Sequence, residues 1–285
     1  MMKWMKRLHS LWRKKKPGKR VALVLSGGGA RGIAHIGAIE ELRARGYEIA
    51  SVAGTSMGAM VGGALAAGKL EELKREALSM KRMRVLGLID LSLGLDHVVG
   101  GKKVMQLLKR LLGDLRIEDT EIPFCCCASD LTTGQERVFR SGSLCSAIRA
   151  SISIPGLFKP ENLDGHSLVD GSVHNTLPLD RVERSEGDIL VAVNVSAAND
   201  YASLPGKGKS AWSENYVNLA AYIMDLMVTV NTQMSLRLTP PDVLVNVPTN
   251  YCGLFEFDKA KQIIAYGRQE MRKQLDAYEA SLGKS

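Results

Sequence analysis

Long apolar runs are absent from this sequence, and their absence excludes an integral membrane protein. The best candidate for a membrane span, residues 217–230, has only 14 residues and contains Asn218 and Asp225, whereas a spanning helix needs about 20 residues. The basic N-terminus is followed by no apolar core of the length that a secretory signal peptide requires. We therefore expect a globular protein located in the cytoplasm.

Cysteine is scarce, with five residues, three of them consecutive at positions 125–127. Neighbouring residues of a strand point to opposite faces, so these three cannot surround a metal ion by themselves. The histidines at positions 35, 97, 166 and 174 show no ligand spacing either. An odd number of cysteines without a framework spacing is typical of a reducing compartment. We expect buried thiols, no metal site and no cofactor.

Acidic residues are missing from the N-terminal segment, which explains the net charge of +8. The first 20 residues contain nine Lys or Arg and no Asp or Glu, and the remaining 29 basic and 30 acidic residues leave the body of the chain close to neutral. A basic surface over the whole fold is therefore not expected, and neither is a nucleic-acid partner. We expect residues 1–19 to be a separate basic segment and residues 20–285 to form the folded domain.

Residues 1–16 combine this positive charge with an apolar stripe at helical spacing. A basic helix with Trp and Leu on one face is typical of an anchor at the membrane interface. We expect an anionic membrane surface as a partner of this segment, which would hold the protein on the inner face of the membrane. A tail packed on its own domain and a disordered arm are the alternatives. The stripe consists of Met1, Trp4, Met5, Leu8, Leu11 and Trp12.

After this segment, predicted strands and helices alternate along the chain. Such alternation predicts an α/β fold whose mostly parallel sheet is covered on both faces. Strands are predicted at residues 21–26, 49–54, 123–129, 136–140, 167–169, 188–195 and 243–247, and helices at 31–45, 57–67, 70–81, 102–112, 179–184, 213–238 and 258–281.

Residues 54–58 (GTSMG) form a G-x-S-x-G motif that places Ser56 between a predicted strand and a predicted helix. The two glycines, Gly54 and Gly58, permit a sharp turn that exposes the serine at the carboxyl end of the strand, facing the helix N-terminus. In this context the motif predicts a nucleophilic serine.

A second glycine-rich turn, residues 27–32 (GGGARG), also follows a strand and opens a helix. Consecutive glycines leave backbone N–H groups uncovered, and such donors bind a phosphate or stabilise a developing oxyanion. The turn also satisfies the G-x-G-x-x-G pattern of dinucleotide-binding folds, which require an acid at the end of the next strand. Here the next strand ends in the residues AGTS at 53–56, so a nucleotide site is the less favoured alternative.

A third element, Asp170-Gly171-Ser172, follows the short predicted strand at 167–169. Alone, an Asp-Gly pair is typical of a turn. Taken together and in this order, the three elements resemble the patatin-like phospholipase family, whose pattern is G-G-G-x-R/K-G, then G-x-S-x-G, then D-G-G/A. The resemblance covers about residues 20–178 and includes residues 153–158 (SIPGLF). Ser172 departs from the family pattern, which has Gly or Ala there.

The resemblance implies a three-layer α/β/α fold and a Ser–Asp dyad without histidine. Ser56 would be the nucleophile and Asp170 its base, acting on acyl esters of phospholipids, lysophospholipids or related lipids. Backbone amides would form the oxyanion hole. The implied oxyanion-hole residues are Gly27, Gly28, Gly29 and Ala30, and the supporting residues are Arg31, Gly32, Gly54, Gly58 and Gly171.

Two alternatives remain open at this point. His174 follows Asp170 by four residues, so a Ser-Asp-His triad in the chain order of α/β-hydrolases is one of them. Against it, Ser56 follows only the second predicted strand, earlier than that fold places its nucleophile. The other alternative is a catalytically silent, membrane-attached regulator. Acyl length, head group and oligomeric state have no signature in the sequence.

Overall fold

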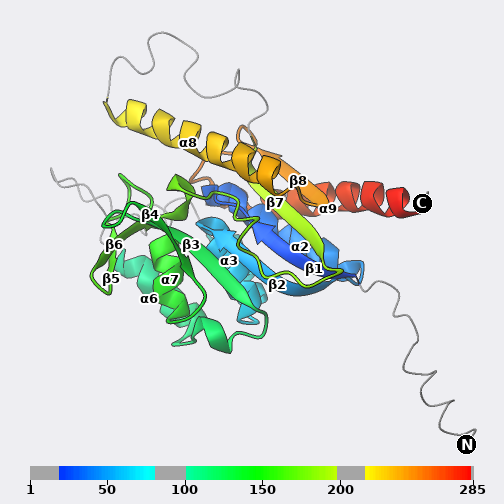
Figure 1. Cartoon of the computed structure of the whole chain (residues 1–285), viewed down its shortest axis with the longest axis horizontal. Helices are drawn as coiled ribbons and strands as arrows, with labels where there is room; N and C mark the ends of the chain where they lie inside the picture. Colours follow the sequence, from blue (N-terminus) through cyan, green and yellow to red (C-terminus); the bar gives the residue numbers. More distant parts are fainter. Residues whose placement is uncertain (1–18, 81–100, 198–215, 284–285) are drawn as a thin grey trace, which may run out of the picture.

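Figure 1 shows the computed structural model of the chain, in which residues 19–80, 101–197 and 216–283 are described. The predicted anchor at residues 1–16 and the histidine at position 97 lie outside the described residues. Within the described ranges, no helix has the length and apolarity needed to cross a membrane.

An eight-stranded sheet forms the centre of the fold, in the order β5-β6-β3-β2-β1-β7-β8, with β4 also paired to β3. Five strands run parallel to one another, which confirms the predicted mostly parallel sheet. The parallel strands are β1 (Arg20–Leu25), β2 (Glu48–Thr55), β3 (Phe124–Asp130), β7 (Ile189–Ala197) and β8 (Val243–Pro248), and the antiparallel ones are β4 (Gln135–Phe139), β5 (Glu161–Leu163) and β6 (His166–Asp170).

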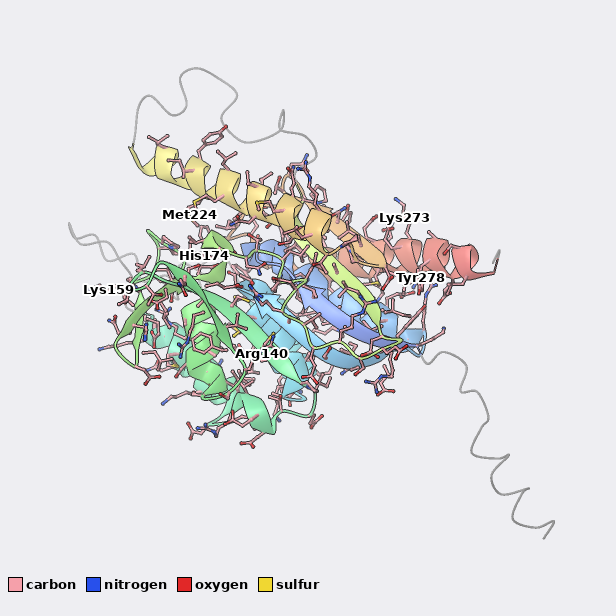
Figure 2. The ribbon with its side chains drawn as sticks, in the orientation of Figure 1. Arg140, Lys159, His174, Met224, Lys273 and Tyr278 are labelled. Carbon is pink, nitrogen blue, oxygen red and sulfur yellow. The ribbon has the colours of Figure 1, made fainter. Side chains whose placement is uncertain are left out.

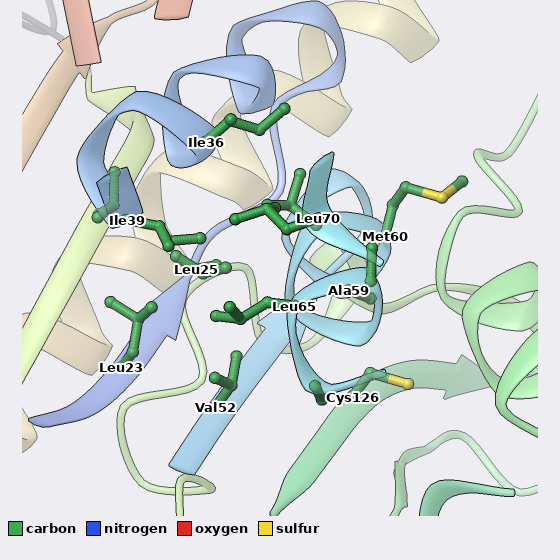
Figure 3. Close-up of a cluster of buried hydrophobic side chains, with 14 of the residues drawn as sticks. Leu23, Leu25, Ile36, Ile39, Val52, Ala59, Met60, Leu65, Leu70 and Cys126 are labelled. Atoms are coloured by element: carbon green, nitrogen blue, oxygen red, sulfur yellow. The ribbon is translucent and has the colours of Figure 1, made fainter. Parts of the chain in front are cut away.

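Helices cover both faces of this sheet, as predicted for a three-layer α/β/α fold (Figure 1). Strand β1 shows the division, because its side chains alternate between the two faces. Leu23 and Leu25 join the larger core beneath α2 and α3, which Figure 3 shows. Val24 faces the opposite side, where Leu236 of α8 packs. The helices are α2 (Ala34–Ala44), α3 (Met57–Ala66), α4 (Leu70–Ser79), α6 (Lys102–Leu112), α7 (Leu144–Ser151), α8 (Tyr216–Leu238) and α9 (Ala260–Leu282), with 3-10 turns η1 (Gly29–Ile33), η2 (Ile117–Asp119), η3 (Gly171–Val173) and η5 (Phe257–Lys259).

Strands β2 and β6 share one edge of β3, and this topology positions the two predicted catalytic residues. Strand β2 ends with Thr55 paired to Cys127, and β6 ends with Asp170 paired to Ala128. Because β4 pairs with β3 over residues 126–130 along the other edge, the ends of β2 and β6 meet on the same edge. The residues that follow β2 therefore lie beside the last residue of β6.

Two predictions of local structure differ from the fold. Residues 179–184, predicted as a short helix, form turns instead, because Leu177 and Leu179 both point at the same sheet face as Val24 and are buried there. Conversely, the structure contains a helix, α7, that was not predicted. It has only eight residues, which is shorter than the window of about 11–18 residues over which helical periodicity is recognised.

Candidate active site

The turn around Ser56 has the geometry of a nucleophile elbow. Ser56 lies between β2 and α3 with φ 54° and ψ −120°, in the left-handed region that residues other than glycine rarely adopt. A Cβ atom at Gly58 would collide with the carbonyl group of Leu25, and one at Gly54 with the backbone of Gly58. Glycine is thus required at both positions for α3 to pack this closely against the ends of β1 and β2.

Asp170 and Ser56 are brought together in a buried environment, with only 2% and 5% of their surfaces exposed. Burial raises the pKa of the Asp170 carboxyl above its ordinary value, and hydrogen bonds from Ser56 and Ser172 lower that pKa by less. The Ser172 amide donates to Oδ1 of Asp170 over 2.8 Å. The carboxyl group is thus oriented by its own turn and interacts with the seryl side chain.

The glycine-rich turn packs directly against this pair. A Cβ atom at Gly27 would lie 2.5 Å from the Ser172 hydroxyl and 3.2 Å from Cβ of Ser56, so only glycine permits this approach. Gly29 has a φ of 58°, in the region that favours glycine. The sequence-predicted turn, nucleophile and carboxylate therefore converge at one place.

The four predicted oxyanion-hole amides are not equivalent. The Gly27 amide donates to the Thr176 carbonyl over 3.1 Å, and the Ala30 amide donates to the Leu254 carbonyl over 2.8 Å. In the described part of the chain, the amides of Gly28 and Gly29 have no hydrogen-bond acceptor. Two of the four predicted donors thus hold the turn, and the other two have no acceptor among the described residues.

Arg31 fastens the turn to the C-terminal third of the chain. Its buried guanidinium donates from Nε to the Val195 carbonyl over 2.8 Å, and from Nη1 to the carbonyls of Cys252 and Thr249 over 3.2 and 3.3 Å. Desolvation lowers the pKa of Arg31 from its ordinary value. Its contacts are those of a structural support.

Among the described residues, no histidine ring forms a hydrogen bond with Ser56 or Asp170. His174, labelled in Figure 2, interacts through Nε2 with the Gly134 carbonyl at 3.2 Å. His166 pairs with Asp130 over 2.7 Å. His35 is fully buried beneath the glycine-rich turn, where Nε2 contacts the Ser26 carbonyl at 2.9 Å and burial lowers its pKa to about 4. Each ring has a structural partner of its own.

Strand β3 carries the three consecutive cysteines, which are free and buried as predicted. Burial raises the pKa of the Cys125 thiol to about 11. Across residues 19–80, 101–197 and 216–283, no group of three or more His, Cys, Asp or Glu side chains has a metal-binding arrangement.

Two parts of the site had no signal in the sequence motifs. Leu254, which follows β8, supports the Ala30 amide and lies against Gly29. The C-terminal end of α7 and the turn that follows it reach both predicted catalytic residues. The hydroxyl of Ser151, the last residue of α7, accepts from the Ser56 amide over 2.9 Å, and the Ser153 carbonyl in the turn accepts from the Asp170 amide over 2.9 Å. Only residues 153–158 of this turn carry a family resemblance.

Comparison with known proteins agrees with this site. The family model for patatin-like phospholipase matches residues 23–182, a span that contains all three motifs. The chain belongs to the patatin-like phospholipase family.

Individual relatives support the same assignment. An uncharacterized NTE family protein of Mycobacterium tuberculosis is 41% identical over 179 residues, which cover 63% of this chain and 50% of that protein. Human patatin-like phospholipase domain-containing protein 6 is 31% identical over 202 residues, covering 68% of this chain and 15% of its own length. The chain thus spans half or less of these curated relatives. VipD from Legionella pneumophila aligns over 90% of this chain and 66% of its own, with 16% identity and a TM-score of 0.47, which is too distant to add to the assignment.

Proposed function

We propose that the chain cleaves acyl ester bonds of phospholipids, lysophospholipids or related lipids, with Ser56 as nucleophile and Asp170 as base. The observation that carries this proposal is the buried Asp170 carboxyl, which interacts with the Ser56 side chain beside the glycine-rich turn. The relatives named as patatin-like phospholipases and as neuropathy target esterase support a lipid substrate.

The first half of the reaction forms an acyl-enzyme. Ser56 Oγ attacks the ester carbonyl carbon while its proton passes to the Asp170 carboxylate, and the free amides of Gly28 and Gly29 stabilise the oxyanion that develops. Asp170 then returns this proton to the departing alcohol oxygen as the C–O bond breaks. In the second half, water attacks the acyl group, its proton passes through Asp170 to Ser56 Oγ, and the fatty acid leaves.

Burial makes Asp170 better suited to accept a proton from Ser56. An exposed carboxylate of ordinary pKa is a weak base for a seryl hydroxyl. Desolvation raises the pKa of Asp170, which brings its basicity closer to that required. An apolar acyl chain bound above the pair would exclude water further and strengthen the same effect.

We also propose that residues 1–19 form a segment distinct from the domain at 20–285, and that residues 1–16 bind an anionic membrane surface. The charge supports this, since the first 20 residues have nine basic and no acidic side chains. Such a segment would hold a cytoplasmic enzyme peripherally at the inner face of the membrane, next to its substrate.

The dyad is tested by ester turnover in three variants of the full chain. Ser56→Ala and Asp170→Asn should each lower kcat by about 10³-fold or more, because they remove the nucleophile and the proton acceptor. His174→Ala should retain turnover, since the ring contacts Gly134. Turnover lost in His174→Ala but kept in Asp170→Asn would support a triad and contradict the proposal. A folded wild-type protein inactive on a panel of lipid and short-chain esters would point to a silent regulator.

A further inference from the structure

The backbone amides of Ser56 and Asp170 both donate to residues at the C-terminal end of α7 or in the turn just after it. The Ser56 amide donates to Oγ of Ser151, and the Asp170 amide donates to the carbonyl oxygen of Ser153, each over 2.9 Å. Helix α7 packs beside α3 and β3 (Figure 1). Three consecutive residues at and just after the end of α7, Ser151 to Ser153, therefore hold the backbone of the proposed nucleophile and that of the proposed base.

The Ser56 amide needs this partner because the sheet offers it none. The pairing of β2 with β3 ends at Thr55 and Cys127, and the turn then carries Ser56 out of the strand. The Ser151 hydroxyl fills the gap, since it accepts from the Ser56 amide and donates to the Cys127 carbonyl over 2.6 Å. Ser151 is fully buried, so no water can take its place without a rearrangement. The Ser151 hydroxyl thus accepts the hydrogen bond that a strand carbonyl would otherwise accept from the Ser56 amide.

The turn is itself fixed from behind by Arg149, which is 2% exposed. The Ser153 hydroxyl donates to the Arg149 carbonyl over 2.8 Å and accepts from the Arg149 guanidinium. The guanidinium also lies 5.2 Å from the ring centroid of Phe158 and donates to the Lys159 carbonyl over 3.4 Å. A charged group held by so many contacts leaves the turn little freedom to move.

We propose that Ser151 is a positioning residue for the nucleophile, holding Ser56 in its left-handed conformation and at the correct distance from Asp170. The inference rests on the proposed function and adds a role that the sequence motifs do not contain. It acts through the Ser56 backbone, so substrate binding does not depend on it. The reaction rate does, because a displacement of about 1 Å at a reacting group can cost about 100-fold in rate.

The matched pair of variants is Ser151→Ala and Ser129→Ala. Both serines are fully buried, but the Ser129 hydroxyl has no hydrogen-bond partner among the described residues, so its loss leaves no described backbone group unsatisfied. We expect Ser151→Ala to lower kcat by about 10- to 100-fold with little change in KM. Ser129→Ala should keep both within about twofold. Ser151→Thr, which retains a hydroxyl, should recover most of the lost kcat.

Amide hydrogen exchange at Ser56 supplies a readout that does not require turnover. Protection of this amide should fall in Ser151→Ala and remain in Ser129→Ala and Ser151→Thr. The proposal is overturned if folded Ser151→Ala keeps wild-type kcat, if Ser151→Thr melts like the wild type yet is as slow as Ser151→Ala, or if Ser129→Ala slows as much. A wild-type chain that protects Ser56 but hydrolyses no ester would instead contradict the proposed function.

Discussion

At the scale of single residues, burial changes what the ionisable groups of this site can do. Asp170 is nearly inaccessible, and burial raises its pKa. His35 is fully buried close by and is held neutral, with a pKa lowered to about 4. The same physical cause thus makes one group a better base and removes the other from acid–base chemistry near neutral pH.

The lowered pKa of His35 leads us to predict a loss of stability in mild acid. The unfolded chain binds a proton at His35 below pH 6.5, whereas the folded chain does so only below about pH 4. The free energy of unfolding therefore falls as the pH drops from about 6.5 to about 4, by a total of about 3 kcal/mol from this residue. Denaturant unfolding at several pH values measures it. His35→Gln, which does not titrate, should show a shallower decline, and an unchanged pH dependence in that variant would contradict the assignment.

At the residue scale the sequence motifs predict Ser56 and Asp170 as the catalytic pair, but they could not separate the four glycine-turn amides. The acceptors that occupy the Gly27 and Ala30 amides are carbonyl groups of Thr176 and Leu254. Those partners lie far along the chain, and a carbonyl group has no residue-type signature. Ser151 was not predicted either, because its partner is a backbone amide, which also has no residue-type signature.

At the scale of elements, prediction succeeded where a segment is a continuous apolar run or where glycines bound it. Strand β1 and the elbow between β2 and α3 are found from an apolar run and two glycines. Helix α7 was not predicted because its eight residues are too few for a clear helical periodicity. The helix predicted at 179–184 was wrong, since this segment forms turns, and Leu177 and Leu179 pack against the sheet.

The proposed membrane binding of residues 1–16 can be tested by a binding experiment. Deletion of residues 2–17 removes seven of the nine basic residues found in the first 20. With roughly 1 kcal/mol for each basic side chain near an anionic leaflet, the deletion should abolish most sedimentation with phosphatidylserine-containing vesicles. Ester turnover on a short-chain substrate should be unchanged and serves as the control. Equal sedimentation of both proteins would show that the segment does not bind the membrane.

At the scale of the whole molecule, the site depends on the order of strands. Ser56 and Asp170 meet because the parallel strand β2 and the antiparallel strand β6 share one edge of β3. The sequence predicts each of the three strands, but their pairing is long-range, and local patterns do not encode it. The family resemblance supplied the expectation that the two residues meet, and the topology gives its physical reason.

The most direct measurement maps the site of fluorophosphonate labelling by peptide mass spectrometry in the wild type, Ser56→Ala and Asp170→Asn. If a proton moves from Ser56 to Asp170 during attack, the adduct forms on Ser56 alone, is absent from Ser56→Ala, and forms at least about 100-fold more slowly in Asp170→Asn. An adduct on another residue, or labelling of Asp170→Asn at the wild-type rate, would contradict the account.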